Sequence, residues 1–237
     1  MKALQQLASL LPDIPRWIEV RSMLLEGSCE VEGLKPDQPD ACFVLWNRRR
    51  ELTAVVGRPD RNAIQETLVR AENKGVVICA PENTEWLGAI LEGWSAGSAT
   101  LHLLKDSSRL PRPDPNSVRF IAADEIATLG YLPPPLLEEL EVVAPTCLIA
   151  ATLVDKMPVS FCYVAWETET LWDISIETLP GHRGKGHAGV AVSFLIGHMN
   201  RKGKQPVWGA EDSNSPSLKL AAKLGFVPVD RLTVFRK

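Results

Sequence analysis

The spacing of apolar and polar residues divides the chain into two series of strands and helices. Residues 3–26 predict two short helices, because breaks at Pro12 and Pro15 interrupt their helical periodicity. The order strand, strand, helix, strand, helix, strand follows, over residues 42–46, 52–56, 60–73, 76–79, 83–94 and 99–104. The first two strands are expected to pair as a hairpin, because only a short polar turn separates them.

Residues 109–117 have no hydrophobic periodicity and are rich in proline, so they predict a boundary between a domain at 1–115 and a domain at 116–237. A strand at 118–121 and helical segments at 124–129 and 135–142 follow. Next come three strands, a helix and a strand, over residues 147–154, 157–166, 171–178, 186–200 and 205–209, and then a helix between Asn214 and Gly225 and a strand at 227–235. The three strands should form an antiparallel meander, and strand 205–209 should lie parallel to strand 171–178 because a helix connects them.

The order strand, strand, helix, strand, helix, strand thus occurs twice, at a separation of roughly 120 residues. The fold class predicted is α/β, with a mixed sheet of the α+β kind. Two interpretations of the first half stay open. It is either a degenerate copy of the second half or an unrelated α/β layer with a similar rhythm.

Composition narrows the function classes. The chain has 237 residues, 45% of them hydrophobic and 23% charged, with a net charge of −3 and a pI near 5.9. This acidic balance argues against non-specific binding to nucleic acid. No stretch approaches the ~20 apolar residues of a membrane span, so we expect a cytoplasmic protein without a membrane partner. The five scattered cysteines have no metal-ligand spacing and are expected to be reduced and mostly buried, and no metal is predicted.

Candidate chemistry is concentrated between Thr178 and Ala188, where a strand ends, a glycine-rich basic loop follows and a helix begins. Glycines at positions 181, 184 and 186 allow the backbone to turn back and to approach a ligand closely. Arg183, Lys185 and the free N–H groups of the next helix offer positive charge to an anion. The stretch therefore predicts a cradle for a phosphate or pyrophosphate.

Other phosphate and nucleic-acid loops fit this stretch less well. No Gly-x-x-x-x-Gly-Lys-Ser/Thr run is present, and the glycine spacing is not that of the dinucleotide fingerprint. Residues 181–184 match a Gly-x-x-Gly nucleic-acid loop, but that module places the loop between two helices, whereas here a strand precedes it. A purely structural glycine turn would leave the two basic residues unexplained.

Two motifs together resemble one enzyme family. Residues 183–188 read Arg-Gly-Lys-Gly-His-Ala, which resembles the Arg/Gln-x-x-Gly-x-Gly/Ala loop of the GNAT acyltransferases. About 30 residues later, Asn214, Leu220, Gly225 and Phe226 match the second GNAT signature, Asn-x-x-Ala-x-x-Leu-Tyr-x-x-x-Gly-Phe, with Ser217 in the alanine place. The resemblance covers about residues 118–237. The first half is then a possible degenerate GNAT-like repeat.

The resemblance implies acetyl-CoA as a co-substrate and direct attack of an amine on its thioester in a ternary complex. Backbone N–H groups of the loop would bind the pyrophosphate, and the strand backbone would hold the pantetheine arm with Asn214 beside it. The residues expected to bind acetyl-CoA are Ile176, Thr178, Arg183, Gly184, Lys185, Gly186, His187, Ala188 and Asn214. Either His182 or His187 could assist phosphate binding, although both are typical of solvated positions.

Catalytic candidates come from the strand that precedes the loop, where alternation places Asp173, Ser175 and Glu177 on one face. Glu177 is the first candidate for the base and Asp173 the second. Many family members carry a tyrosine acid at the position of Ala221, so the acid is expected to be Ser217 or a water molecule.

The function predicted is an N-acetyltransferase for a small-molecule or peptide amine acceptor, with a homodimer as one option for its assembly. The alternative is a non-catalytic acyl-CoA-binding or sensor protein. A nucleic-acid-binding module would need a basic surface, and the net charge does not indicate one.

Overall fold

The computed structural model describes residues 2–34 and 42–237, and these form two compact units. Unit 1 consists of the described residues up to His102, together with Gly209–Leu218 and Pro228–Lys237. Unit 2 consists of Leu103–Trp208 and Lys219–Val227. Four elements contribute residues to both units: β5 (Ser95–Leu104), β10 (Gln205–Glu211), α8 (Ser215–Lys223) and β11 (Phe226–Arg236).

Unit 1 begins with three short helical segments and continues as a mixed sheet with helices between its strands. Its elements are α1 (Lys2–Ser9), η1 (Pro15–Trp17), α2 (Ile18–Glu26), β1 (Glu30–Glu32), β2 (Phe43–Asn47), β3 (Leu52–Val56), α3 (Arg61–Arg70), β4 (Val76–Cys79), η2 (Pro81–Asn83) and α4 (Thr84–Gly88). The strands follow the order β1-β2-β3-β4-β11, in which β3 and β4 are parallel and the other neighbours are antiparallel.

Two helices form a core with the sheet of unit 1. Ile64 and Leu68 of α3 and Leu87 of α4 pack with apolar side chains of the strands, among them Val44 and Val77. Helix α3 begins after Asp60, whose carboxylate accepts a hydrogen bond from the Asn62 N–H at 2.8 Å. Asp60 is therefore the N-cap residue of this helix.

Unit 2 contains the antiparallel meander and the loop with the candidate chemistry. Its elements are η3 (Ser107–Arg109), β6 (Val118–Ile121), α5 (Ala123–Ile126), α6 (Pro134–Val143), β7 (Ile149–Val154), β8 (Met157–Glu167), β9 (Leu171–Thr178), η4 (Pro180–His182) and α7 (His187–Asn200). The strands follow the order β10-β9-β8-β7-β6, in which β9 and β10 are parallel and the rest antiparallel. Both the meander and the parallel pair were predicted.

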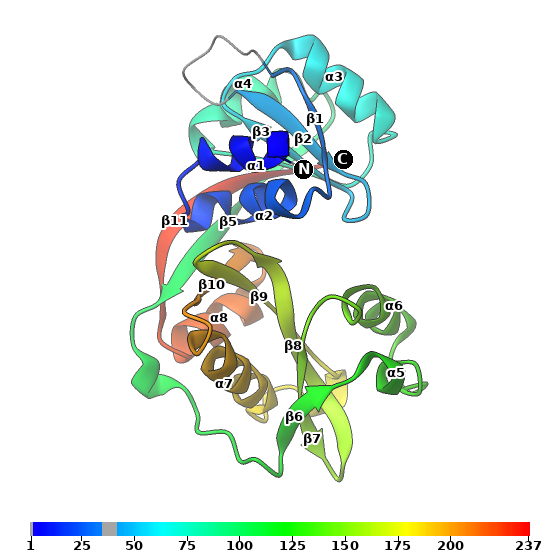
Figure 1. Ribbon diagram of the computed structural model, residues 1–237, viewed down its shortest axis with the longest axis vertical. Coiled ribbons are helices and arrows are strands. Elements are labelled where there is room, and N and C mark those ends of the chain that lie inside the picture. The colour runs from blue at the N-terminus through cyan, green and yellow to red at the C-terminus, as the bar shows by residue number, and fades with distance from the viewer. Residues whose placement is uncertain (1, 35–41) are drawn as a thin grey trace. The chain divides into compact units, whose positions relative to one another are not determined.

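The strands of unit 2 have helices on both faces (Figure 1). Helix α7 packs on one face, where it contacts β6 to β9 through Val192, Leu195 and other apolar side chains. Helices α5 and α6 cover the other face and share a core with Phe161 and Tyr163 of β8. A strand of this sheet therefore presents alternate side chains to α7 and to α6.

Two expectations differ from the structure in their boundaries. Helix α4 ends at Gly88, whereas the pattern predicted a helix over residues 83–94, and a glycine at this point weakens a helix. The predicted domains 1–115 and 116–237 differ from the two units, because residues 233–236 of β11 pair with β4. The proline-rich stretch is also packed, since Pro111 contacts the position of Gly189 on α7.

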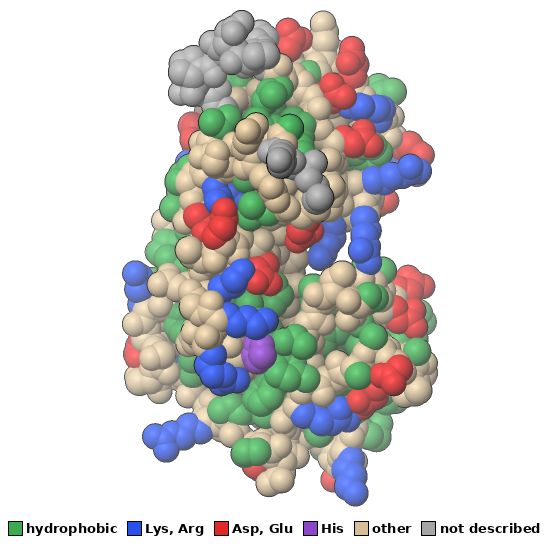
Figure 2. Space-filling model, viewed as in Figure 1, with side chains coloured by type: hydrophobic (Ala, Val, Ile, Leu, Met, Phe, Trp, Pro, Cys, Tyr) green, Lys and Arg blue, Asp and Glu red, His purple; other side chains and the backbone are tan. Residues whose placement is uncertain are grey.

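Three expectations came from composition: the burial of the cysteines, the membrane spans and the distribution of charge. Cys79 and Cys162 are buried, but Cys29, Cys42 and Cys147 are only half-buried, so the expectation of mostly buried thiols was wrong. Among the described residues no helix is both long and apolar enough to cross a membrane. Basic and acidic side chains are interspersed on the face drawn in Figure 2.

Candidate functional site

The glycine-rich loop connects β9 to α7 in unit 2. Gly184 and Gly186 have positive φ angles of 76° and 90°, and Gly186 is the N-cap residue of α7. A Cβ atom built at either position would have no heavy atom within 4 Å, so the backbone here is open to a ligand. The predicted turn is confirmed at these two glycines. Gly181 lies within η4 and does not have a positive φ.

Helix α7 begins with unpaired donors. Gly186 has no side chain to cap the helix, and the amide N–H groups of residues 184–188 have no acceptor among the residues that the structure describes. Free N–H groups at a helix N-terminus attract anions, because the helix dipole adds on the order of 0.3–1 kcal/mol to their hydrogen bonds. Five adjacent donors of this kind fit a phosphate or pyrophosphate group.

The basic side chains of the loop fold back onto the backbone. The Arg183 Nε donates to the Thr178 carbonyl oxygen at 2.9 Å, and its Nη2 lies 2.6 Å from Oε1 of Glu177. The Lys185 Nζ donates to the Gly181 carbonyl oxygen at 3.0 Å. Positive charge is thus held beside the free amides, although Arg183 is also paired with the carboxylate predicted to be the base.

Two histidines flank this loop. The rings of His182 and His187 have their centroids 6.0 Å apart. Burial lowers the pKa of His187 below its ordinary value, and the neighbouring His182 and Lys185 act in the same direction. The shift favours the neutral, hydrogen-bonding form of the His187 ring.

Helix α7 is anchored at its first residue by Thr152 of β7. This side chain is buried, and its Oγ1 donates to the His187 carbonyl oxygen at 2.9 Å. Replacing Thr152 with valine keeps the shape but removes this bond, so we expect the free energy of unfolding to fall by about 1 kcal/mol, measured by urea denaturation. As a control, Thr146→Val removes a longer, part-buried bond of 3.3 Å from an exposed residue to the Val143 carbonyl oxygen and should cost less. Equal losses in both variants would contradict an anchoring role for Thr152.

Strand β9 pairs with β10 only at its beginning. The parallel ladder joins Leu171, Trp172 and Asp173 to residues 205–207 and extends no further. The Leu179 N–H donates to Val159, so by alternation the main-chain groups of Ile176 and Thr178 face away from β8. This edge of β9 leads directly to the loop.

The two predicted pantetheine-binding residues differ along this edge. The N–H and C=O groups of Ile176 have no partner among the described residues. Those of Thr178 are engaged, since its N–H donates to Oε1 of Glu177 at 3.2 Å and its carbonyl accepts from Arg183. Ile176 is therefore the residue with main-chain groups available to an extended ligand.

The polar face of β9 lies on the side of α6. Glu177 pairs across the sheet with Phe161, and Ser175 with Tyr163, and both of these aromatic residues belong to the core under α5 and α6. Glu177 lines a cavity of about 330 Å³ between the start of α6 and the end of β9. Of the three polar residues on this face, Glu177 lines the cavity. Asp173, four residues earlier on the same face, is half-buried and does not line this cavity.

Asn214 and Ser217 lie in unit 1, whereas Glu177 and the loop lie in unit 2. The Oδ1 atom of Asn214 accepts a hydrogen bond from the Ser217 N–H at 3.2 Å, so Asn214 caps α8. Ala221 of the same helix is fully buried. A tyrosine at that position would not fit without repacking.

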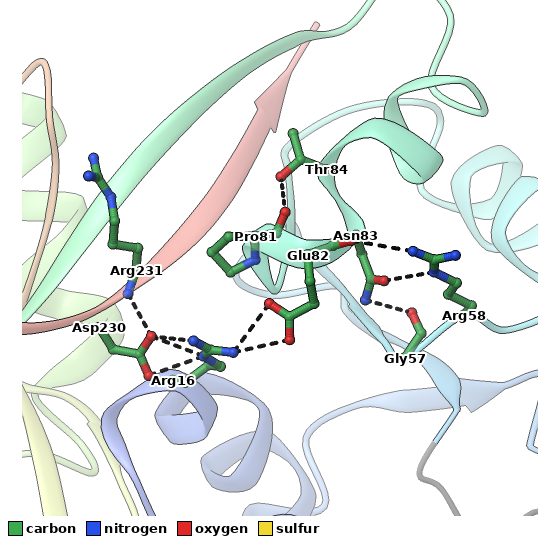
Figure 3. A network of polar contacts seen from close by, with 9 residues as sticks. All are labelled: Arg16, Gly57, Arg58, Pro81, Glu82, Asn83, Thr84, Asp230 and Arg231. Carbon is green, nitrogen blue, oxygen red and sulfur yellow. Dashed lines mark hydrogen bonds and ion pairs between the residues drawn. The ribbon is translucent and has the colours of Figure 1, made fainter.

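The corresponding place in unit 1, after β3 and before α3, is closed by side chains (Figure 3). Asn83 donates to the Gly57 carbonyl oxygen at 3.0 Å and accepts from Nε of Arg58 at 3.1 Å. Asp60 caps α3, and the parallel ladder includes all four residues of β4. The first turn of α7 in unit 2 has no capping side chain, whereas that of α3 in unit 1 has the Asp60 carboxylate. The β9–β10 ladder ends early, whereas the β3–β4 ladder spans the whole of β4.

A second part of the same network fastens the N-terminal segment of unit 1. Arg16 pairs with Asp230 of β11 at 2.5 Å and with Glu82 at 3.1 Å (Figure 3). These ion pairs hold η1 against the sheet of unit 1. They place no unpaired hydrogen-bond donor near Gly57.

Three side chains of the site could not be predicted from the sequence. Thr152 anchors α7, Glu139 of α6 lines the cavity, and the Tyr163 hydroxyl donates to Oε1 of Glu139. Each lies on an element distant in sequence from the loop and belongs to no local motif. Only the packing of α6 and β7 around the meander places them here.

Comparisons with known proteins find a family model that matches most of the second half. Residues 150–235 match the model of the GNAT acetyltransferase family, which confirms the resemblance found in the two motifs. No curated protein sequence matches the chain.

Solved structures show the same fold over the whole chain. A GCN5-related N-acetyltransferase-like protein from Streptococcus suis is 18% identical with a TM-score of 0.68, covering 99% of this chain and 98% of that chain. An acetyltransferase from the GNAT family from Colwellia psychrerythraea is 13% identical with a TM-score of 0.59, covering 99% and 94%. A tandem GNAT protein from the clavulanic acid biosynthesis pathway is 12% identical with a TM-score of 0.61, covering 98% and 92%. The predicted α/β fold class with a mixed sheet is confirmed.

Proposed function

We propose that this chain, whose residues 150–235 belong to the GNAT acetyltransferase family, transfers an acetyl group from acetyl-CoA to an amine. The observation that carries the proposal is the open start of α7, where five adjacent amides have no acceptor among the described residues. Next to them, the main-chain groups of Ile176 extend past the end of the β9–β10 ladder. A pyrophosphate joined to an amide-containing arm matches these two sets of groups.

Each part of the ligand has a matching group in unit 2. The amides of residues 184–188, with the charges of Arg183 and Lys185, would bind the pyrophosphate. The N–H and C=O of Ile176 would bind amides of the pantetheine arm as an additional strand would. Bound acetyl-CoA would supply the activated acetyl group. Residues of the chain would position the two substrates and transfer the proton.

The chemistry requires a base more than an acid. An alkylamine has a pKa of ~10.4, so a neutral amine at pH 7 costs roughly 4.6 kcal/mol, whereas a thiol with a pKa of ~8.5 leaves readily as the thiolate. The amine nitrogen would form a bond to the acetyl carbon while the carbon–sulfur bond breaks. The amine proton would pass to a carboxylate, and coenzyme A would leave as the thiolate, which would then take up a proton from water. Glu177 is our first candidate for this carboxylate and Asp173 the second.

Replacing Glu177 with glutamine is expected to lower kcat by at least ~100-fold, because a positioned base contributes about that much or more. The dissociation constant of acetyl-CoA should change little, since a glutamine oxygen can still accept from Arg183. An assay of thiol release measures kcat, and titration calorimetry measures the dissociation constant of acetyl-CoA. Asp173→Asn is the matched comparison, and a larger loss of kcat in that variant would transfer the role of base to Asp173.

A second function remains open because of Ala221. Its side chain is fully buried where many family members carry the tyrosine acid, which favours a non-catalytic acyl-CoA-binding or sensor protein. Titration calorimetry with acetyl-CoA and thiol release with an amine panel separate the two functions. Binding together with amine-dependent release supports the transferase, and binding without release supports the sensor. If acetyl-CoA does not bind, both functions are excluded.

A further inference from the structure

The cavity beside Glu177 has apolar walls and three charged residues. Prolines and leucines of α6 and of the turn after β9 form most of its lining, and Glu139, Glu177 and Arg183 supply the charges. Its volume of about 330 Å³ lies at the lower end of the range for small-molecule sites, which is roughly 300–1,000 Å³. A small molecule with an aliphatic chain fits such a space, and a folded or extended peptide does not.

The charges of the lining leave one carboxylate without a cation. Arg183 contacts Glu177 at 2.6 Å and also donates to the Thr178 carbonyl oxygen, so its guanidinium is already engaged. Glu139 has no ion pair among the residues that the structure describes. The lining therefore has a net negative charge at Glu139, which attracts a cation and repels a carboxylate.

Glu139 is held in place from two sides. Its helix, α6, packs through the buried Leu136, Leu140 and Val143 onto the core of unit 2. The hydroxyl of Tyr163, a residue only 2% exposed, donates to Oε1 of Glu139. This leaves Oε2 as an oriented acceptor, and an oriented group binds a ligand with less loss of conformational freedom.

We propose that this cavity binds the acetyl acceptor and that the acceptor is a small aliphatic diamine. The ammonium at one end would bind Glu139, and the chain would lie along the apolar wall. The amine at the other end would then lie near Glu177, the candidate base on the same cavity. Glu139 is thus a specificity residue and Tyr163 a positioning residue. This inference rests on the proposed function, because it names the substrate of that reaction.

The test compares three probes of equal chain length that differ at one end: 1,4-diaminobutane, butylamine and 4-aminobutanoate. Titration calorimetry is carried out on the full chain saturated with coenzyme A, which has no acetyl group to transfer during the titration. We expect 1,4-diaminobutane to bind about tenfold more tightly than butylamine, because a hydrogen bond to a charged group contributes about that factor. We expect 4-aminobutanoate to bind more weakly than butylamine.

Two variants assign the preference to one side chain. Glu139→Gln should remove the tenfold preference, whereas the control Glu138→Gln, on the same helix but outside the cavity lining, should keep the preference. Tyr163→Phe should weaken diamine binding to a smaller degree, and circular dichroism checks that each variant is folded. Equal binding of the diamine and butylamine by the wild type, or an unchanged preference in Glu139→Gln, would overturn the proposal.

Thiol release with the same probes separates this inference from the proposed function. Diamine binding that depends on Glu139 without thiol release would support the site and exclude the transferase. Thiol release that is fastest with 4-aminobutanoate would support the transferase and exclude the diamine.

Discussion

Replacing Arg183 with glutamate is expected to abolish the binding of acetyl-CoA. In the structure the Arg183 guanidinium bridges Glu177 and the Thr178 carbonyl oxygen beside the free amides of the loop. A carboxylate at this position would face Glu177 and would repel the pyrophosphate. Losing one charge-assisted contact and gaining one repulsion together cost roughly 3–4 kcal/mol, or more than a hundredfold in affinity. Titration calorimetry measures the effect.

The matched control makes the same change of charge at the other end of α7. Lys202 is exposed and follows the helix by two residues, so Lys202→Glu alters the net charge equally but leaves the loop intact. We expect its dissociation constant for acetyl-CoA to remain within about twofold of the wild-type value at 0.15 M salt, because charges farther apart than ~8 Å are screened. Unchanged affinity in Arg183→Glu, or an equal loss in Lys202→Glu, would exclude the loop as the pyrophosphate site.

The second large effect is expected from Gly186→Val. Gly186 has a φ of 90° as the N-cap of α7, a conformation that a β-branched residue adopts only with strain. The strained residue would reorient the peptide groups of residues 184–188, and the five donors would no longer converge. We expect the affinity for acetyl-CoA to fall by about a hundredfold, since two or more hydrogen bonds to a charged group are lost.

A glycine with a similar conformation provides the control for strain. Gly203 has a φ of 74°, lies in the turn after α7 and has no heavy atom within 4 Å of an added Cβ. Gly203→Val should therefore lower the free energy of unfolding by about the same amount as Gly186→Val, roughly 1–2 kcal/mol. Only Gly186→Val should also lower affinity. A parallel loss of affinity in both variants would show that general destabilisation, and not the loop, is responsible.

The two halves of the chain have a similar order of strands and helices, but the start of α7 is open to an anion and the start of α3 is closed to one. Before α7 the N-cap is Gly186, which leaves the helix donors free. Before α3 it is Asp60, whose carboxylate binds the Asn62 N–H and would repel an anion. Asn83 and Arg58 then bond to one another and to the Gly57 carbonyl beside the strand end. We therefore expect acyl-CoA to bind only at the loop of the second half.

Much of the fold could be predicted because local patterns determine it. The meander strands, the α7 helix and the N-cap at Asp60 depend on apolar spacing and on residues a few positions away. The phosphate cradle was predictable for the same reason, because Gly184, Gly186 and Arg183 are adjacent in the sequence. Family comparison then confirmed the motifs of the second half.

Predictions that required distant contacts succeeded less well. The end of the chain was assigned wholly to the second domain, yet β11 pairs with β4 of the first half. Strand pairing between distant segments leaves no local periodicity, so the pattern of β11 could not show its partner. Glu177 was predicted as the first candidate for the base, and its ion pair with Arg183 depends on how the loop folds back.

The sequence by itself determined where an anion can bind, because glycine conformation, basic charge and a helix start are properties of neighbouring residues. Only the tertiary structure decided which groups of that site remain available. It left the amides of residues 184–188 and the Ile176 backbone free, and it engaged Thr178 and Arg183. It also brought Glu139, held by Tyr163, to the cavity that Glu177 lines. Which hydrogen-bonding groups are paired, and what shape a cavity has, depend on residues far apart in the chain. Only folding brings such residues together.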